Sequence, residues 1–253
     1  MSETGRYLKL TLAYDGTAYA GWQVQPESRT LQSTLEDAVE QVTGKRIRTT
    51  ASGRTDAGVH ALAQVVSCVT DCQLSTEILR RALNANLPQD IVVLEVVEER
   101  EGFHAIRNAV AKRYRYVIHD GPLRDVFTLR YAWHFSQRLD EAAMHGGAVR
   151  LQGTHDFASF ESSGSERLTT VRTINDIRVC RQKNDLQKVV LEIEADGFLY
   201  NMVRAIVGSL VEIGRGRRSL LWIDEVLAAN SRKAAATTAP PQGLFLVNVT
   251  YDN

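Results

Sequence analysis

Residues 6–16, RYLKLTLAYDG, alternate between apolar and polar side chains. In an extended chain the apolar side chains fall on one face: Leu8, Leu10, Leu12 and Tyr14. A period of two residues predicts a half-buried β-strand, and Asp15-Gly16 is typical of the turn that ends one. The chain therefore opens with a strand that has one face for a hydrophobic core.

Helical periodicity follows at residues 31–44, LQSTLEDAVEQVTG. The apolar side chains at helical spacing are Leu31, Leu35, Ala38, Val39 and Val42. Ser33 and Glu36 have the spacing of a capping box, and Gly44 suits a helix C-terminus. This stretch predicts a helix over its whole length.

The rest of the chain continues this alternation of strand-like and helix-like segments. In the N-terminal part we expect further strands at 46–52, 62–71 and 91–99 and a helix at about 76–84. Beyond Lys112 we expect strands at 112–120, 131–135, 172–182, 188–195 and 244–251, with helices at 139–153, 199–214 and 219–229. Each half then has strands with two helices between them, which predicts an α+β protein of two similar lobes, 1–110 and 111–253.

The composition excludes little by itself. The chain has 253 residues, of which 44% are hydrophobic, and its 30 basic and 30 acidic side chains cancel. Any nucleic-acid surface must therefore come from local clustering of charge. The three cysteines suit reduced thiols, and neither an apolar signal core nor a membrane-spanning run is present. We expect a soluble, cytoplasmic protein.

One carboxylate, Asp56, lies in a glycine-containing turn, GRTDAGVHA, at residues 53–61. Asp followed by Ala-Gly is ordinary turn chemistry, so the aspartate can be purely structural. The functional reading is a carboxylate presented on a tight loop, with Arg54 close by to hold it ionised. The turn alone does not decide between these readings.

Basic residues gather in two stretches. Residues 104–138 carry seven basic residues and two acidic ones, and their RYRY segment places Tyr114 and Tyr116 on the strand face opposite Arg113 and Arg115. Such tyrosines can stack on bases while arginines follow phosphates, or they can be core residues beside solvated arginines. The second stretch, GRGRRS at 214–219, contains Arg215, Arg217 and Arg218. These cations also suit the dipole of the preceding helix.

Arg204 interrupts a helix that is otherwise nearly all apolar. Gly208 lies four residues on, on the same face, where a missing side chain lets another backbone approach. Arg204 can be a flank residue with its guanidinium in water. Alternatively it is a buried cation that needs a carboxylate partner, because an unpaired buried charge is costly.

The histidines predict no metal site, since none has a paired spacing: His60, His104, His119, His134, His145 and His155. The sequence also contains neither a phosphate-loop lysine motif nor a dinucleotide glycine fingerprint. We therefore assign no metal site and no nucleotide-binding motif from these patterns.

Eight motifs occur in a characteristic order: YDGTAYAGWQ (14–23), GRTDAGVHA (53–61), NANLP (84–88), FHA (103–105), KRYRY (112–116), HDF–SF (155–160), MVRAIVGSL (202–210) and GLFL (243–246). Together they closely resemble the TruA family of tRNA pseudouridine synthases, over nearly the whole chain. The family often has Arg directly after Phe-His-Ala, whereas this chain has Ile106 there and Arg107 next.

The resemblance implies two ferredoxin-like or RRM-like lobes, with their sheets joined into an extended, mainly antiparallel sheet and a central active-site cleft. It implies a homodimer that binds tRNA and isomerises uridine to pseudouridine in the anticodon stem-loop, at positions 38, 39 or 40, without metal or cofactor. Asp56 matches the catalytic aspartate, Tyr114 the tyrosine that packs on the target base, and Arg204 the arginine that pairs with the aspartate. Arg54 matches a basic residue that holds the flipped nucleotide. The remaining expected RNA contacts are Arg107, Arg113, Arg115, Arg215, Arg217 and Arg218.

This chemistry needs an ionised carboxylate near the sugar C1′ atom. Asp56 can attack C1′ or the base C6 atom, or it can remove the 2′ proton to give a glycal. The sequence leaves these routes open. Two other functions compete: an RNA-binding protein without catalysis on the same scaffold, and a carboxylate hydrolase. The hydrolase usually needs a second working acid, and none recurs beside Asp56.

Overall fold

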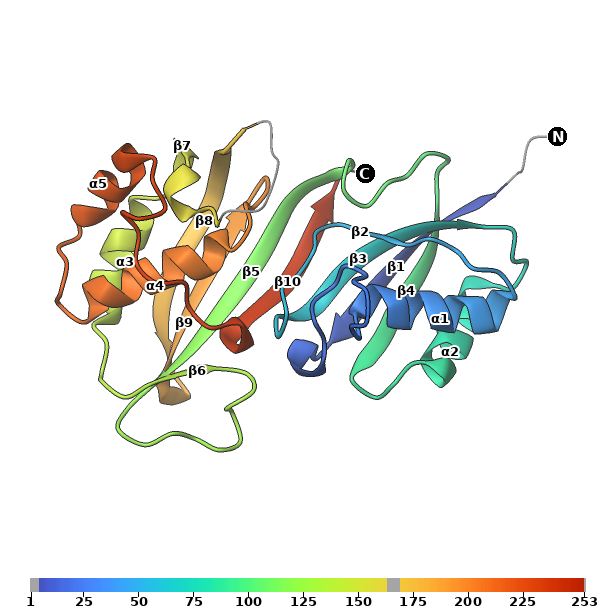
Figure 1. Ribbon diagram of the computed structural model, residues 1–253, viewed down its shortest axis with the longest axis horizontal. Helices are drawn as coiled ribbons and strands as arrows, with labels where there is room; N and C mark the ends of the chain where they lie inside the picture. Colours follow the sequence, from blue (N-terminus) through green and yellow to red (C-terminus); the bar gives the residue numbers. More distant parts are fainter. Residues whose placement is uncertain (1–4, 163–168, 253) are drawn as a thin grey trace. The chain divides into compact units, whose positions relative to one another are not determined.

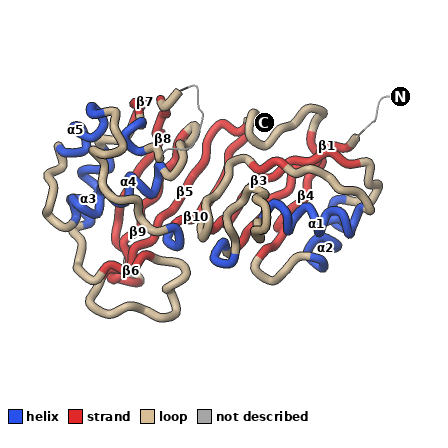
Figure 2. Tube along the Cα trace, in the orientation of Figure 1, coloured by secondary structure: helices blue, strands red, loops and turns tan. Residues whose placement is uncertain are grey.

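The computed structural model describes residues 5–162 and 169–252 (Figure 1). The chain divides into two compact units, Met1–Val110 with Leu246–Asn253, and Ala111–Phe245. Each unit combines helices with a mainly antiparallel sheet, which confirms the α+β class (Figure 2). Residues 246–253, which the sequence-based division placed in the C-terminal lobe, fall with the first unit.

The first unit builds its sheet in the order β4-β1-β3-β10. Its elements are β1 (Arg6–Tyr14), a 3-10 turn η1 (Gly16–Ala18), α1 (Leu31–Thr43), β2 (Thr50–Ala51), β3 (His60–Thr70), α2 (Thr76–Asn86), β4 (Ile91–Glu99) and most of β10 (Leu244–Tyr251). Strand β1 pairs antiparallel with both β3 and β4. Figure 1 shows α1 and α2 on one face of this sheet.

The alternation in β1 is the pattern that the sequence predicts. Leu8, Leu10, Leu12 and Tyr14 are all buried, and the side chains between them are not. A strand of this kind has one face for the core, and α1 supplies Leu31, Leu35, Ala38 and Val39 as further buried side chains. The core of the first unit therefore lies between its helices and one sheet face.

The start of α1 differs from the predicted capping box. Its N-cap is Thr30, whose hydroxyl accepts a hydrogen bond from the Ser33 N–H at 3.3 Å. The Glu36 carboxylate turns instead to the backbone N–H of Thr49, at 2.9 Å. The predicted capping box is therefore wrong. Glu36 lies on the buried face of the helix, where its carboxylate bonds Thr49 of a neighbouring segment. Gly44 ends the helix with a φ of 74°, as expected.

The second unit builds its sheet in the order β5-β9-β8-β7. Its elements are most of β5 (Ala109–Asp120), β6 (Trp133–Phe135), α3 (Glu141–Val149), β7 (Gly153–Asp156), a 3-10 turn η2 (Ala158–Phe160), β8 (Val171–Gln182), β9 (Asp185–Ala195), α4 (Met202–Gly214), α5 (Trp222–Ala229) and a 3-10 turn η3 (Pro241–Gly243). The short β6 runs parallel to β5, whereas β9 pairs antiparallel with both β5 and β8. Figure 1 shows the three helices on one face of this sheet.

Helix α4 forms the centre of the second core. Its buried side chains include Met202, Val203, Ile206, Val207, Leu210 and Val211. Gly208 confirms the expected close approach of another backbone: a Cβ atom there would lie 1.9 Å from the carbonyl oxygen of Thr237. The segment that runs past this helix thus depends on the absence of a side chain at Gly208.

Two strands differ from the sequence-based expectation. Strand β2 covers only Thr50–Ala51 of the predicted 46–52, because Thr49 gives its N–H to Glu36 rather than to a neighbouring strand. Strand β7 was not expected, since GTHD has no apolar alternation. Among the residues that the structure describes, no helix is long and apolar enough to cross a membrane.

Candidate active site

Asp56 lies in the turn between β2 and β3 of the first unit. The N–H of Val59 donates to the carbonyl oxygen of Asp56 at 3.1 Å, and Gly58 has a φ of 77°, which favours glycine. Asp56 is half-buried, while Arg54 and Ala57 are exposed. The turn therefore presents its carboxylate at the surface of a well-packed unit.

Glycines of the first motif clamp this turn through the backbone. The N–H of Trp22 donates to the carbonyl oxygen of Thr55 at 2.9 Å. Gly21 has a φ of 98°, and a Cβ atom there would lie 2.8 Å from the same carbonyl oxygen. A Cβ atom at Gly16 would lie 2.0 Å from the carbonyl oxygen of Val59. The turn is thus held on both sides by backbone that only glycine allows to come so close.

A buried polar network supports the same turn from beneath. The phenol oxygen of Tyr14 lies 2.8 Å from the hydroxyl oxygen of Thr55. Gln64 Nε2 donates to the carbonyl oxygen of Gly53 at 2.8 Å, and Gln64 Oε1 accepts from the Ser52 hydroxyl at 2.7 Å. Burial raises the pKa of Tyr14 to about 12. The phenol is therefore neutral at ordinary pH, and what it contributes is a hydrogen bond.

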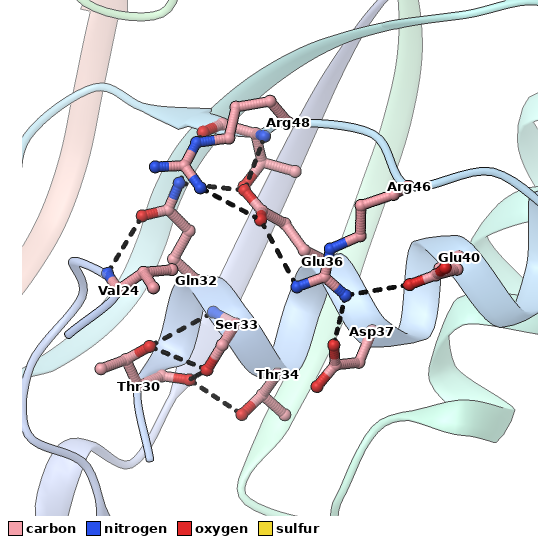
Figure 3. Close-up of polar contacts among 11 residues, drawn as sticks. Val24, Thr30, Gln32, Ser33, Thr34, Glu36, Asp37, Glu40, Arg46 and Arg48 are labelled. Atoms are coloured by element: carbon pink, nitrogen blue, oxygen red, sulfur yellow. Dashed lines mark hydrogen bonds and ion pairs between the residues drawn. The ribbon is translucent and has the colours of Figure 1, made fainter. Parts of the chain in front are cut away.

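Gln32 of α1 connects Trp22, whose N–H bonds the Asp56 turn, with the segment that leads into β2 (Figure 3). Its N–H donates to the carbonyl oxygen of Trp22 at 3.0 Å, and its Oε1 accepts from the N–H of Val24 at 3.2 Å. Its Nε2 donates to the carbonyl oxygen of Thr49 at 3.0 Å and to Glu36 Oε1 at 2.9 Å. One amide side chain thus joins the segments that precede and follow α1.

The Glu36 carboxylate completes this arrangement, with a side chain only 2% exposed (Figure 3). Its Oε1 accepts from the N–H and the hydroxyl of Thr49, at 2.9 and 3.1 Å. Its Oε2 faces the guanidinium groups of Arg46 and Arg48, at 3.8 and 3.6 Å. A buried carboxylate is tolerated when it is paired and hydrogen-bonded in this way. Gln32 and Glu36 therefore fix the backbone on either side of α1, before the candidate site.

Tyr114 lies on β5 in the second unit, 7% exposed, with its ring edge-on to Phe198 at 5.0 Å between centroids. Tyr116 shares its strand face and donates from its hydroxyl to the carbonyl oxygen of Pro240 at 2.7 Å. Arg113 and Arg115 point to the opposite face, as the alternation predicts. Both tyrosines are therefore packed side chains, and any base contact by Tyr114 would use only the part of its ring that Phe198 leaves open.

Arg113 and Arg115 take part in a cross-strand charge network. Arg113 bonds Glu194 at 3.1 Å and Asp176 at 3.0 Å, and Arg115 bonds Glu192 at 2.7 Å. Burial raises the pKa of Glu192, but the hydrogen bonds and charges of the neighbouring arginines outweigh it and hold that pKa below its usual value. This face of the sheet balances its own charges, so RNA binding by these two arginines stays a prediction.

Arg204 lies in the first turn of α4 and is half-buried. Its Nε donates to the carbonyl oxygen of Ala239 at 2.8 Å, and a terminal nitrogen donates to Asn201 Oδ1 at 2.7 Å. Burial raises the pKa of Tyr116, and the nearby charge of Arg204 partly offsets this. Asp56 belongs to the first unit and Arg204 to the second, so their pairing stays a prediction.

The other predicted arginines occupy varied environments. Arg54, Arg107, Arg217 and Arg218 are exposed, and Arg218 lies over the Trp222 ring at 5.0 Å. Arg215 bonds Glu212 at 2.8 Å and lies over the Phe135 ring at 5.2 Å. The described part of the chain contains no group of three or more His, Cys, Asp or Glu side chains that could hold a metal ion.

Sequence reasoning did not assign a role to four polar residues around these sites: Tyr14, Gln32, Gln64 and Asn201. Tyr14 was expected only as a core side chain. Gln32 could have been noticed, because it is a polar side chain on the apolar face of α1, where it is buried. Nothing in the sequence distinguishes Asn201 from an ordinary helix N-cap.

Comparison with known proteins agrees with this distribution of motifs. A family model described as tRNA pseudouridine synthase matches residues 11–106 and 148–252. A tRNA pseudouridine synthase A from Geobacillus sp. is 46% identical over 247 residues, which cover 97% of this chain and 98% of that protein. One from Moorella thermoacetica is 47% identical over 246 residues, with 96% and 99% covered. The chain therefore belongs to the tRNA pseudouridine synthase family and is an isomerase that converts uridine in tRNA to pseudouridine.

Proposed function

We propose that this isomerase acts on the anticodon stem-loop of tRNA, at positions 38, 39 or 40, and that Asp56 is its catalytic carboxylate. The observation that carries the role of Asp56 is the rigidity of its turn. The N–H of Trp22 bonds the carbonyl of Thr55, where the missing side chain of Gly21 allows the close approach, and Tyr14 bonds the Thr55 hydroxyl, one residue before the aspartate. Such support is what a reactive group needs to keep a productive geometry.

The reaction breaks the N1–C1′ bond, turns the uracil, and forms a C5–C1′ bond. The proton on C5 is lost and N1 gains one, so the atoms balance without a cofactor. An ionised Asp56 can serve this sequence as a nucleophile toward C1′ or C6, or as the base that removes the 2′ proton. In each route the carboxylate must be charged.

Arg204 is proposed to pair with Asp56 and so favour its ionised form. The target base must leave the stack to react, and Tyr114 is proposed to offer it a stacking face. Arg54, next but one to Asp56, is proposed to hold the flipped nucleotide. These roles rest on the family resemblance and on the placement of each side chain within its own unit.

Phosphate contacts are proposed first for the exposed arginines, Arg54, Arg107, Arg217 and Arg218. Arg113, Arg115 and Arg215 already bond carboxylates and would have to exchange them for phosphate. Neutralising one true phosphate contact should weaken tRNA binding and lower the slope of log K against log salt by about 1. Titrations at several salt concentrations would therefore separate the two groups of arginines.

The catalytic role of Asp56 is tested with tRNA that carries tritium on uridine C5. The wild-type protein should release tritium to water, whereas Asp56→Asn should bind tRNA and release none. Asp71→Asn is the control, because Asp71 is an exposed aspartate of the same unit that bonds Lys45. Wild-type release by Asp56→Asn would overturn the assignment of Asp56.

The position in tRNA is tested with three transcripts in which the uridine at 38, 39 or 40 is replaced by cytidine. Loss of tritium release from the matching transcripts would identify the modified sites, and full release from all three would contradict the anticodon-arm proposal. A homodimer in the cytoplasm is proposed on the family resemblance alone. Sedimentation of the purified protein would test the dimer, since a single monomer boundary at micromolar concentration would contradict it.

A further inference from the structure

Asn201 immediately precedes α4 and has an unusual backbone. Its φ is 61° and its ψ is 8°, the left-handed region, which residues other than glycine seldom adopt, although asparagine does so more often than most. An asparagine before a helix normally keeps an extended backbone and caps the first N–H groups with its side chain. Within the part of the chain that the structure describes, the Asn201 side chain makes no such capping bond. Its amide is used elsewhere.

The Asn201 amide connects two polar groups. Its Oδ1 accepts from a terminal nitrogen of Arg204 at 2.7 Å, and its Nδ2 donates to the hydroxyl oxygen of Ser162 at 3.1 Å. The bond to Arg204 fixes which way the amide faces, because a guanidinium can only donate and therefore requires the amide oxygen, which leaves the nitrogen toward Ser162. The left-handed backbone thus aims an acceptor at the guanidinium.

A second acceptor reaches Arg204 from another segment. The carbonyl oxygen of Ala239 accepts from Arg204 Nε at 2.8 Å, and the N–H of Ala239 donates to the carbonyl oxygen of Arg204 at 3.0 Å. The segment lies this close because Gly208 has no Cβ where the Thr237 carbonyl passes. Two acceptors on different parts of the chain therefore fix the plane of one guanidinium.

These two acceptors are a carbonyl and an amide, whereas Arg181 of the same unit bonds two carboxylates, Asp120 at 2.7 Å and Glu141 at 2.9 Å. The amide and the carbonyl fix the orientation of the Arg204 guanidinium and are not themselves a countercharge. A planar guanidinium held in this manner can direct a further N–H group at an anion.

We infer that Asn201 is a positioning residue, which orients Arg204 toward the reacting carboxylate through the bond to its terminal nitrogen. The inference rests on the proposed function, in which Arg204 pairs with Asp56. It adds a residue whose backbone is held in an uncommon conformation so that its amide can serve the arginine. Asn201 acts through Arg204 and does not itself touch the substrate.

The first test replaces Asn201 by glycine, which accepts the left-handed backbone without strain. Asn201→Gly should fold with an unchanged or higher melting temperature and bind tRNA with an unchanged KM. Its kcat for tritium release should fall about 10- to 100-fold, the range that misplacement of a catalytic group costs. A role limited to the backbone would leave kcat as it is, so a wild-type kcat in Asn201→Gly would overturn the inference.

Asn230→Gly is the control for this substitution. Asn230 also has a left-handed backbone, with a φ of 44°, but it ends α5 and is exposed. The same chemical change there should keep kcat and KM at wild-type values. An equal loss of kcat in both variants would show a general effect of glycine and would also overturn the inference.

A double-mutant cycle distinguishes this inference from the proposed function itself. Arg204→Leu should lower kcat, and adding Asn201→Gly to it should lower kcat no further, because the arginine through which Asn201 acts is gone. A further 10-fold loss in the double variant would show that Asn201 acts independently of Arg204. If Arg204→Leu alone keeps the wild-type kcat, the proposed role of Arg204 fails first.

Discussion

The phenol oxygen of Tyr14 lies 2.8 Å from the hydroxyl oxygen of Thr55, the residue before Asp56, and both side chains are buried. Tyr14 ends β1 and Thr55 opens the turn, so this bond joins the most regular part of the first unit to its candidate catalytic loop. The side chain of Gln64 extends the same network to Gly53. The position of the carboxylate is thus linked to the core of the unit by hydrogen bonds.

Tyr14→Phe should lower kcat about 10-fold and the free energy of unfolding by about 1 kcal/mol, because one buried hydrogen bond is lost while the ring is kept. The pH–rate profile should keep its shape, since the pKa of Tyr14 is about 12 and the phenol does not titrate in the working range. Tyr7→Phe, on the same strand but outside the core, is the control. A shifted alkaline limb in Tyr14→Phe would contradict a purely supporting role.

Gly21→Ala should reduce both stability and kcat. Its Cβ would lie 2.8 Å from the carbonyl oxygen of Thr55, and its φ of 98° strains any other residue. Gly44→Ala meets only the second penalty: its φ is 74°, and among the described residues nothing lies within 4 Å of a Cβ there. Gly44→Ala should therefore cost about 1 kcal/mol and keep kcat. Thermal melting measures the loss of stability, and tritium release measures kcat. Equal kcat in both variants would contradict a role of Gly21 in holding the Asp56 turn.

Glu36→Gln should lower the free energy of unfolding by about 1–3 kcal/mol. The new amide would place a donor against Arg46 and Arg48, where the carboxylate now places an acceptor. Glu40→Gln changes the same chemistry at a half-exposed position of the same helix and should stay within about 0.5 kcal/mol. Denaturant unfolding compares them. Equal stability of the two variants would show that Glu36 contributes no more than a surface charge.

The buried carboxylate of Asp120 should make the free energy of unfolding depend on pH in the acidic range. Burial raises its pKa, but hydrogen bonds and charge from Arg181, with the Leu139 N–H and Arg138, outweigh this and hold the pKa below its usual value. Because the folded-state pKa is the lower one, the stabilisation is present above the unfolded pKa of about 4 and is lost as the pH falls through the folded value.

Asp120→Asn removes that linkage and leaves Arg181 without its buried partner charge. It should cost about 3 kcal/mol at pH 7, and the difference from wild type should shrink below about pH 4. Denaturant midpoints at pH 7, 5 and 3 measure the trend. A difference that stays constant across this range would show that the pKa of Asp120 is not lowered by folding.

The sequence predicts elements whose pattern is local. The alternation of β1 and the spacing of α1 follow from one strand or one helix, and both are found as expected. Gly208 is also predictable, because a glycine on the packed face of a helix has few other uses. The capping box expected of Ser33 and Glu36 is not found: Thr30 is the N-cap, and Glu36 bonds Thr49, which depends on where Thr49 lies in space.

Some residues of the candidate site can be identified from the sequence and others cannot. Asp56 and Arg204 become candidates through the family resemblance, because the glycine turn and the apolar helix by themselves leave a structural role open for each. Gln32 and Asn201 cannot be assigned from the sequence, because their partners are 17 and 3 residues away and are chosen by backbone geometry. Asparagine tolerates a left-handed backbone better than most residues, but its type alone does not show that Asn201 adopts one.

Strand β10 has a consequence for the order in which the protein is made. Residues 246–251 complete the sheet of the first unit next to β3, yet the ribosome adds them only after all of the second unit. The second unit is one continuous stretch of chain and can close during translation, as domains generally do. The sheet of the first unit stays incomplete until β10 is made. The strand next to β10 is β3, which the Asp56 turn leads into. Newly made chains should therefore complete the sheet beside the candidate catalytic loop last, although the residues of that loop emerge among the first.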